Sequence, residues 1–188
     1  MINYKFLLFL TLFWGASINA SDNLSDAIKD INANVIFMRH TLAPGYGDPD
    51  NFSINDCSTQ RNLSAKGIDQ ARRIGIFFRK SNVQFSDILS SQWCRCKDTA
   101  ENLNIGNWEE FSGLNSFFEE HADRDNTLNL LYQKINNLPN DKITLMVTHQ
   151  VVISAVTNIY TQSGGIVLYN SRNKKSKLFN MENISTYE

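Results

Sequence analysis

Arginine and histidine side chains accompany three short apolar segments that lie far apart in the chain. Arg39 and His40 come directly after the apolar run Val35–Met38. His149 follows a second apolar run, one threonine later, and Arg95 lies shortly after a third. Guanidinium groups bind phosphate oxygens through paired N–H donors, and a neutral imidazole can serve as a nucleophile. These residue types predict a site for a phosphate-like anion, although an Arg-His pair at the end of a strand can also be a solvated edge.

Buried strands followed by helices are the elements that would position these side chains. Short runs rich in β-forming residues predict strands at Asn34–Met38, Asp87–Ser90 and Ile143–Val147. Ser64 and Ser91 are suitable N-caps for the helices that follow. The expected helices cover residues 24–28, the segment from Ser64 to about Asn82, the segment after Ser91, residues 127–138 and the segment after His149.

The alternation of strands and helices favours an α/β fold, a three-layer sandwich with a mostly parallel central sheet flanked by helices. Strands at Ile166–Tyr169 and near Lys177–Met181 are expected to form a closing hairpin. Open α/β sheets bind ligands at the carboxyl ends of their strands. Arg39, His40 and His149 are therefore expected to share one crevice.

Composition indicates an ordinary globular protein. The chain has 188 residues, of which 42% are hydrophobic, and a formal net charge of −1. No long basic run is present in the sequence. Nucleic acid and acidic membrane surfaces are therefore not expected as partners, and any anion site must be local.

The first twenty residues have the pattern of a secretory signal peptide. Lys5 precedes the apolar stretch Phe6–Trp14, and a small and polar segment ends at Ala20. We therefore expect residues 1–20 to be removed and residues 21–188 to form a single domain. The apolar stretch is short for a membrane span, so no stable membrane anchor is expected. The predicted location is periplasmic or secreted.

Four motifs follow one another along the chain. They are Val35-Ile36-Phe37-Met38-Arg39-His40-Thr41, Arg61-Asn62-Leu63-Ser64-x-x-Gly67-x-x-Gln70-Ala71, Ser90-Ser91-x-x-x-Arg95-Cys96-x-x-Thr99-Ala100 and Val147-Thr148-His149. In type and order they resemble the histidine phosphatase superfamily, the phosphoglycerate-mutase-like proteins. The resemblance covers nearly the whole mature chain and is closest to the small exported histidine phosphatases.

This resemblance implies a phosphoric monoester hydrolase with the phosphoglycerate-mutase-like fold. His40 would attack phosphorus and form a phosphohistidine, while Arg39, Arg95 and His149 would hold the phosphoryl oxygens. Such a reaction needs no metal or other cofactor. The expected substrate is a small phosphate ester, for example a phosphosugar or a phosphorylated envelope glycan such as a lipopolysaccharide core. A second interpretation is a catalytically weak or inactive phosphate-binding module of the same fold.

Two positions depart from the family pattern. Thr41 stands where a glycine usually follows Arg-His, so its side chain would narrow the pocket or bind phosphate. Gln150 stands where one branch has the acid that protonates the leaving group, and it is interpreted here as a phosphate ligand. Another branch places that acid after the second strand, where this chain has Glu119, Glu120 and Asp123. Solvated loop charges remain the alternative interpretation of these carboxylates.

Three cysteines in an exported chain leave at least one unpaired within a monomer. Cys94 and Cys96 point about 200° apart on a helix, so only one of them can face Cys57, and the spacing does not decide which. Within the stretch that matches the family, Cys96 follows Arg95 directly, and we predict a Cys57–Cys96 disulfide. Three buried thiols are the alternative.

Metal binding is not predicted. A Cys-x-Cys pair with the distant His149 is too sparse for a zinc or copper site. Asp48, Asp50 and Asp56 lack the regular spacing of a calcium loop and are interpreted as loop polarity. His121 lies in a charged segment and is interpreted as a surface residue.

Overall fold

The structure is a computed structural model that describes residues 24–181. Within this range one sheet has the strand order β3-β2-β4-β1-β5-β6. Strand β1 pairs in parallel with β4, β4 with β2, and β2 with β3, whereas β5 pairs antiparallel with β1, and β6 pairs antiparallel with β5. The strands are β1 (Val35–Arg39), β2 (Phe85–Ser90), β3 (Glu109–Glu110), β4 (Ile143–Thr148), β5 (Ile166–Tyr169) and β6 (Ser176–Phe179).

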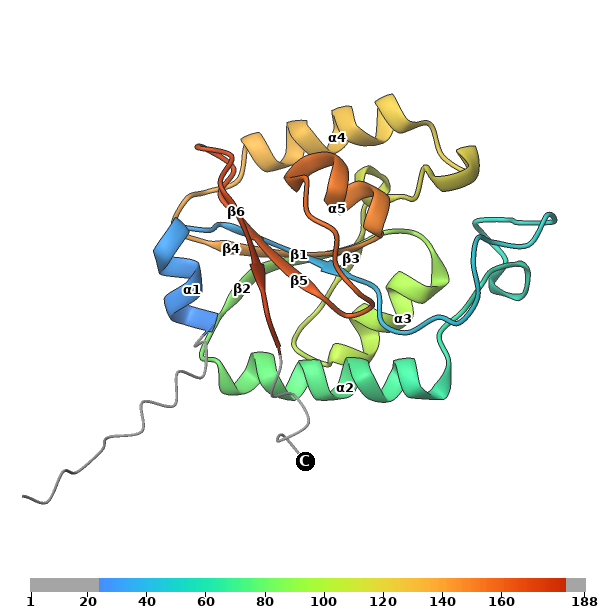
Figure 1. The fold of residues 1–188 in the computed structure, drawn as a ribbon, viewed down its shortest axis with the longest axis horizontal. Helices are drawn as coiled ribbons and strands as arrows, with labels where there is room; N and C mark the ends of the chain where they lie inside the picture. Colours follow the sequence, from blue (N-terminus) through green and yellow to red (C-terminus); the bar gives the residue numbers. More distant parts are fainter. Residues whose placement is uncertain (1–23, 182–188) are drawn as a thin grey trace, which may run out of the picture.

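Helices cover both faces of this sheet (Figure 1). Alternate residues of β1 point in opposite directions, so Ile36 and Met38 pack with α1, α2 and α3, whereas Val35 and Phe37 pack with α4 and α5. The predicted three-layer α/β sandwich with a mostly parallel sheet is confirmed. The helices are α1 (Leu24–Ile31), α2 (Ala65–Lys80), α3 (Cys94–Leu103), α4 (Arg124–Asn136) and α5 (Gln150–Thr157), with 3₁₀ turns η1 (Cys57–Thr59), η2 (Ser112–Leu114) and η3 (Phe118–Glu120).

The register of the central strands brings the polar residues to one edge. Arg39 of β1 pairs with Thr148 of β4, and the backbone N–H of His40 donates to the Thr148 carbonyl at 3.0 Å. The backbone N–H of Ser91 donates to the carbonyl of Val147, one residue earlier, at 2.9 Å. Residues that follow β1, β4 and β2 therefore meet at the carboxyl ends of these strands.

Two helices begin differently from the sequence expectation. Ser64 caps α2 as predicted, since its side chain accepts a hydrogen bond from Gly67 N. Ser91 is not the N-cap of α3, because the helix begins at Cys94 with Trp93 as its N-cap. Helix α4 begins three residues earlier than expected, because Asp123 accepts a hydrogen bond from Asn126 N and caps it.

Close contact between α2 and α3 fixes the C-terminal end of α3 against α2. A Cβ on Gly75 of α2 would lie 1.9 Å from the carbonyl oxygen of Leu103 in α3, so only glycine permits this approach. Across residues 24–181, no helix combines the length and apolarity needed to cross a bilayer. The predicted signal peptide, residues 1–20, lies outside the described part of the chain.

Candidate active site

A cavity of about 230 Å³ lies at the carboxyl ends of β1 and β4. Its lining includes Arg39, His40, Arg95 and His149, the four residues at the centre of the predicted anion site. The structure therefore brings together side chains from the ends of β1 and β4 and from the first turn of α3. The remaining lining residues are Gly45, Tyr46, Gly47, Arg61, Ser116, Phe118, Gln150 and Val151.

His40 is buried, with 2% of its surface exposed, and its Nδ1 lies 2.8 Å from the carbonyl oxygen of Thr41. A carbonyl oxygen can only accept a hydrogen bond, so Nδ1 carries the ring proton and Nε2 keeps its lone pair. Burial, and then the positive charge of Arg95, hold the pKa of His40 well below 6.5. The residue is therefore a neutral imidazole with one nitrogen available as a nucleophile.

His149 is the N-cap residue of α5 and is also buried. Its Nε2 lies 2.9 Å from the hydroxyl of Ser91 and 3.4 Å from the thiol of Cys96. Burial, followed by repulsion from Arg95 and His40, holds the pKa of His149 well below 6.5. With Nε2 occupied on the protein side, Nδ1 is the nitrogen left for a ligand in the cavity.

Both predicted phosphate-binding arginines have a donor without a protein acceptor. Arg39 donates from Nη1 to the carbonyl of Thr161 at 3.0 Å, while its Nε is buried and has no hydrogen-bond partner among the described residues. The Nε of Arg95 is likewise buried and unpaired. Buried N–H groups in native proteins rarely lack an acceptor. An anion in the cavity would supply one.

Comparisons with known proteins show which fold this is. No family model and no curated protein sequence matches the chain. Among solved structures, the protein histidine phosphatase SixA bound to tungstate matches with a TM-score of 0.57 at 15% identity, covering 82% of this chain and 99% of SixA. A mycobacterial glucosyl-3-phosphoglycerate phosphatase matches with a TM-score of 0.54 at 13% identity, covering 78% of this chain and 96% of the other.

A phosphoglycerate mutase from Plasmodium falciparum has the same fold, with a TM-score of 0.50 at 16% identity. The match covers 80% of this chain and 90% of the mutase chain. The chain has the fold of the histidine phosphatase superfamily. The resemblance inferred from the four sequence motifs is confirmed at the level of the fold.

Thr41 and Gln150 do not offer free polar groups to the cavity. The hydroxyl of Thr41 lies 3.1 Å from the hydroxyl of Thr99, and Thr41 is absent from the cavity lining. Gln150 does line the cavity, but its amide donates to the Ile159 carbonyl at 3.2 Å and accepts from Thr161 N at 2.8 Å. The structure thus supports neither residue as a direct phosphate ligand.

Glu119 lies closer to the cavity than Glu120. A Cβ built on Gly47, a lining residue, would come within 2.6 Å of a Glu119 carboxylate oxygen. Both glutamates have positive φ angles, 55° and 62°, which non-glycine residues rarely adopt and which often occur at functional sites. Both glutamates are exposed, but it is the Glu119 carboxylate that lies beside the cavity lining, and Asp123 caps α4. Among the three predicted acids, the structure favours Glu119.

Sequence reasoning missed Asp48 and undervalued Arg61. The Asp48 side chain is only 3% exposed and forms an ion pair with Arg95, so the interpretation as loop polarity is wrong. Arg61 lines the cavity and is fixed by hydrogen bonds from Nε to the Gly47 carbonyl at 2.7 Å and from Nη1 to the Ala43 carbonyl at 2.6 Å. The motif Arg61-Asn62-Leu63-Ser64 was a usable signal for Arg61, whereas nothing in the sequence separates Asp48 from its neighbouring aspartates.

The disulfide joins Cys57 to Cys94, with Cα atoms 5.7 Å apart, so the predicted Cys57–Cys96 pairing is wrong. Cys94 faces the loop that carries Cys57, whereas Cys96 faces inward toward the backbone of Thr148 and the ring of His149. Burial raises the pKa of the Cys96 thiol to about 12, so this cysteine stays protonated.

No cluster of three or more His, Cys, Asp or Glu side chains suited to a metal ion occurs in residues 24–181. His121 lies outside the cavity lining, and its ring packs on Phe52 at 4.5 Å between centroids. Its side chain is 22% exposed, so it is partly covered rather than fully at the surface.

Proposed function

We propose that the chain is an exported phosphomonoesterase that works through a phosphohistidine on His40. The observation that carries this proposal is the hydrogen bond from His40 Nδ1 to the Thr41 carbonyl. It leaves the lone pair of Nε2 free in a cavity lined by Arg39, Arg61 and Arg95. A neutral nucleophile beside fixed positive charges is what transfer of a phosphoryl group requires.

The reaction proceeds in two steps. His40 Nε2 attacks phosphorus, the bond from phosphorus to the ester oxygen breaks, and that oxygen takes up a proton as the alcohol leaves. Water then attacks the phosphohistidine and gives a proton back to the carboxylate that protonated the alcohol, the P–N bond breaks, and phosphate and neutral His40 are regenerated. Arg39 and Arg95 donate hydrogen bonds to the phosphoryl oxygens in both steps, because each has a buried Nε without a protein acceptor. SixA bound to tungstate, a tetrahedral oxyanion, supports an anion site in this fold.

Glu119 is the proposed acid that protonates the leaving group. Its carboxylate lies against Gly47, a residue of the cavity lining. A carboxylic acid at this position would reach the ester oxygen without competing for the phosphoryl oxygens.

The aromatic residues of the cavity lining support a small substrate with a ring. Tyr46 is 83% exposed, and its ring is held edge to face against Phe118 with centroids 5.1 Å apart. Both residues line the cavity together with Val151. Sugar rings pack their C–H faces against aromatic side chains, so we propose a phosphosugar or a phosphorylated envelope glycan as the substrate class.

Export is proposed from the signal-like residues 1–20. The Cys57–Cys94 disulfide supports it, since disulfides persist in oxidising compartments such as the periplasm and the extracellular space.

A phosphate-binding module without turnover is the second candidate. It is favoured by one observation: none of the residues that line the cavity is a carboxylate, so no acid stands at the lining itself. The two candidates differ in a single experiment on purified protein. A panel of sugar phosphates, glycerol phosphate and an aryl phosphate should show multiple turnovers with released phosphate. Stoichiometric phosphohistidine without further release would instead support the binding module.

A further inference from the structure

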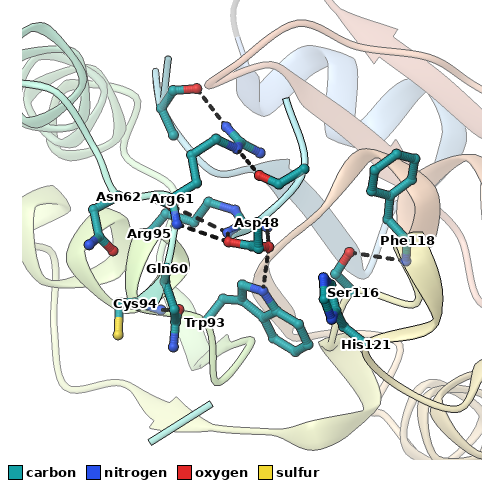
Figure 2. A network of polar contacts seen from close by, with 12 residues as sticks. Asp48, Gln60, Arg61, Asn62, Trp93, Cys94, Arg95, Ser116, Phe118 and His121 are labelled. Atoms are coloured by element: carbon teal, nitrogen blue, oxygen red, sulfur yellow. Dashed lines mark hydrogen bonds and ion pairs between the residues drawn. The ribbon is translucent and has the colours of Figure 1, made fainter. Parts of the chain in front are cut away.

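Asp48 is a buried carboxylate that binds Arg95 through both of its oxygens (Figure 2). Oδ1 accepts from Arg95 Nη1 at 2.8 Å, and Oδ2 accepts from Arg95 Nη2 at 3.0 Å. Both side chains are 3% exposed. This paired geometry fixes the plane of the guanidinium as well as its position.

The pairing leaves one edge of Arg95 for a ligand. A guanidinium has five N–H donors, and a carboxylate that binds both terminal nitrogens uses only the two donors that point away from the stem. The edge formed by Nε and the second N–H of Nη2 is therefore not used by Asp48. Nε has no acceptor among the described residues, although it is buried in the wall of the cavity.

Asp48 is itself held by donors from two other segments. Oδ1 also accepts from the backbone N–H of Arg61 at 2.9 Å, and Oδ2 accepts from the indole N–H of Trp93 at 3.1 Å. The carboxylate thus receives four hydrogen bonds from three residues in the two segments around it (Figure 2). Although burial opposes ionisation, the hydrogen bonds from Arg95 and Arg61 keep the pKa of the Asp48 carboxyl below its ordinary value. Asp48 therefore stays charged at neutral pH.

Charge balance in the cavity agrees with a dianionic ligand. Arg39, Arg61 and Arg95 line it, and Asp48 cancels one of these three positive charges, leaving two while the histidines are neutral. A phosphate ester carries a charge of about −2 near neutral pH.

We propose that Asp48 is a positioning residue that turns the Nε edge of Arg95 toward the phosphoryl oxygens of the substrate. The inference rests on the proposed function, since it assigns a role within the same anion site. Asp48 does not touch the substrate in this account and acts only through Arg95. A residue that merely anchored the loop would affect stability but would not act through this arginine.

The test measures binding of inorganic phosphate by calorimetry, which needs no turnover. In Asp48→Asn the amide nitrogen meets N–H donors, so Arg95 loses its fixed orientation. Phosphate affinity should fall by about 10- to 100-fold, the effect of misaligning one charge-assisted contact. Asp56→Asn is the matched control: this aspartate is an exposed residue of the same loop that caps η1, and binding should change less than about twofold.

A double-mutant cycle separates positioning from anchoring. In an Arg95→Lys background the paired geometry is already lost, so adding Asp48→Asn should weaken phosphate binding by less than about threefold. The same 10- to 100-fold loss in both backgrounds, or normal phosphate binding in Asp48→Asn, would overturn the proposal. If Asp48→Asn does not fold, Asp48→Glu replaces it, because it keeps the charge but displaces the carboxylate by one methylene. A chain that binds phosphate but turns over no ester would contradict the proposed function. The double-mutant cycle would still test the role of Asp48, because it measures phosphate binding and not turnover.

Discussion

His40 and His149 lie edge to face, with ring centroids 5.5 Å apart. Both rings are buried at the carboxyl ends of neighbouring parallel strands, and both have pKa values well below 6.5. Burial is the main cause in each case, and the charge of Arg95 comes second. Burial, reinforced by the charge of an arginine that lines the same cavity, thus keeps both histidines neutral.

This arrangement predicts loss of stability on acidification. The unfolded chain takes up protons on these histidines near pH 6.5, whereas the folded chain takes them up only at lower pH. The free energy of unfolding should therefore fall as the pH drops below 6.5, until the folded-state pKa values are reached. Urea unfolding of wild type and His40→Gln between about pH 8 and pH 5 measures it. The variant has one titrating group fewer and should lose less stability, and equal losses would contradict the assigned pKa direction.

The two arginines with unpaired Nε atoms should dominate transition-state stabilisation. Arg39→Ala and Arg95→Ala should each lower kcat/KM by about 100- to 1,000-fold, or roughly 3–4 kcal/mol, the effect of removing one preorganised donor. Arg73→Ala is the control, because Arg73 is a partly exposed residue of α2 that pairs with Asp69 on the same helix. Competitive inhibition by vanadate should weaken in parallel with kcat/KM. Full activity in Arg39→Ala or Arg95→Ala would contradict a role for that arginine in binding the phosphoryl group.

Glu119→Gln tests the leaving-group acid against its neighbour. An amide cannot donate a proton, so turnover of a sugar phosphate should fall by about 100-fold or more, within the range of general acid catalysis. An aryl phosphate, whose leaving group is stable as an anion, should be much less affected. Glu120→Gln should leave both rates unchanged, since it is the carboxylate of Glu119 that lies against the cavity-lining Gly47. Equal losses on both substrates would argue against acid catalysis by Glu119.

The Cys57–Cys94 disulfide can be located by peptide mapping. Trypsin cleaves after Arg95 and so separates Cys94 from Cys96. The non-reduced digest should contain the Cys57 peptide linked to the peptide that ends at Arg95, and reduction should release them. A link to the Cys96 peptide, or three free thiols, would contradict the structure.

Stability provides an independent check on the disulfide. Cys57→Ser should cost about 4 kcal/mol in the chain-entropy model, given a sequence separation of 37 residues. Cys94→Ser should cost a similar amount, because the same bond is lost. Unfolding of the variants and of reduced wild type in urea gives the comparison.

The strand ends were predictable because polarity changes abruptly where each buried strand stops. Arg39-His40 and His149 follow runs of apolar residues, and parallel pairing of β1 with β4 brings them to one edge. The order of four short motifs was enough to indicate the fold. These features are local in sequence, so periodicity and spacing could reveal them.

The partner of Arg95 was not predictable, because it depends on contacts between distant segments. Asp48 and Arg95 are separated by 47 positions, and Asp48 resembles any other loop aspartate until the fold buries it. The predicted disulfide pairing was wrong for a related reason. Cys94 and Cys96 flank the same arginine, and only the rotation of α3 about its axis decides that Cys94 faces the loop while Cys96 faces His149.

Covalent trapping on His40 tests the central claim most directly. Wild type mixed with a phosphate ester and quenched rapidly in alkali should contain one acid-labile phosphate, which peptide mass spectrometry should place on His40. His40→Ala should carry none and should lose activity, while its circular dichroism spectrum stays native-like. His121→Gln changes a histidine that lies outside the cavity lining but contacts Glu119, and it should still carry its phosphate on His40. Turnover by wild type with no phosphohistidine at any time, or undiminished turnover by His40→Ala, would contradict the account.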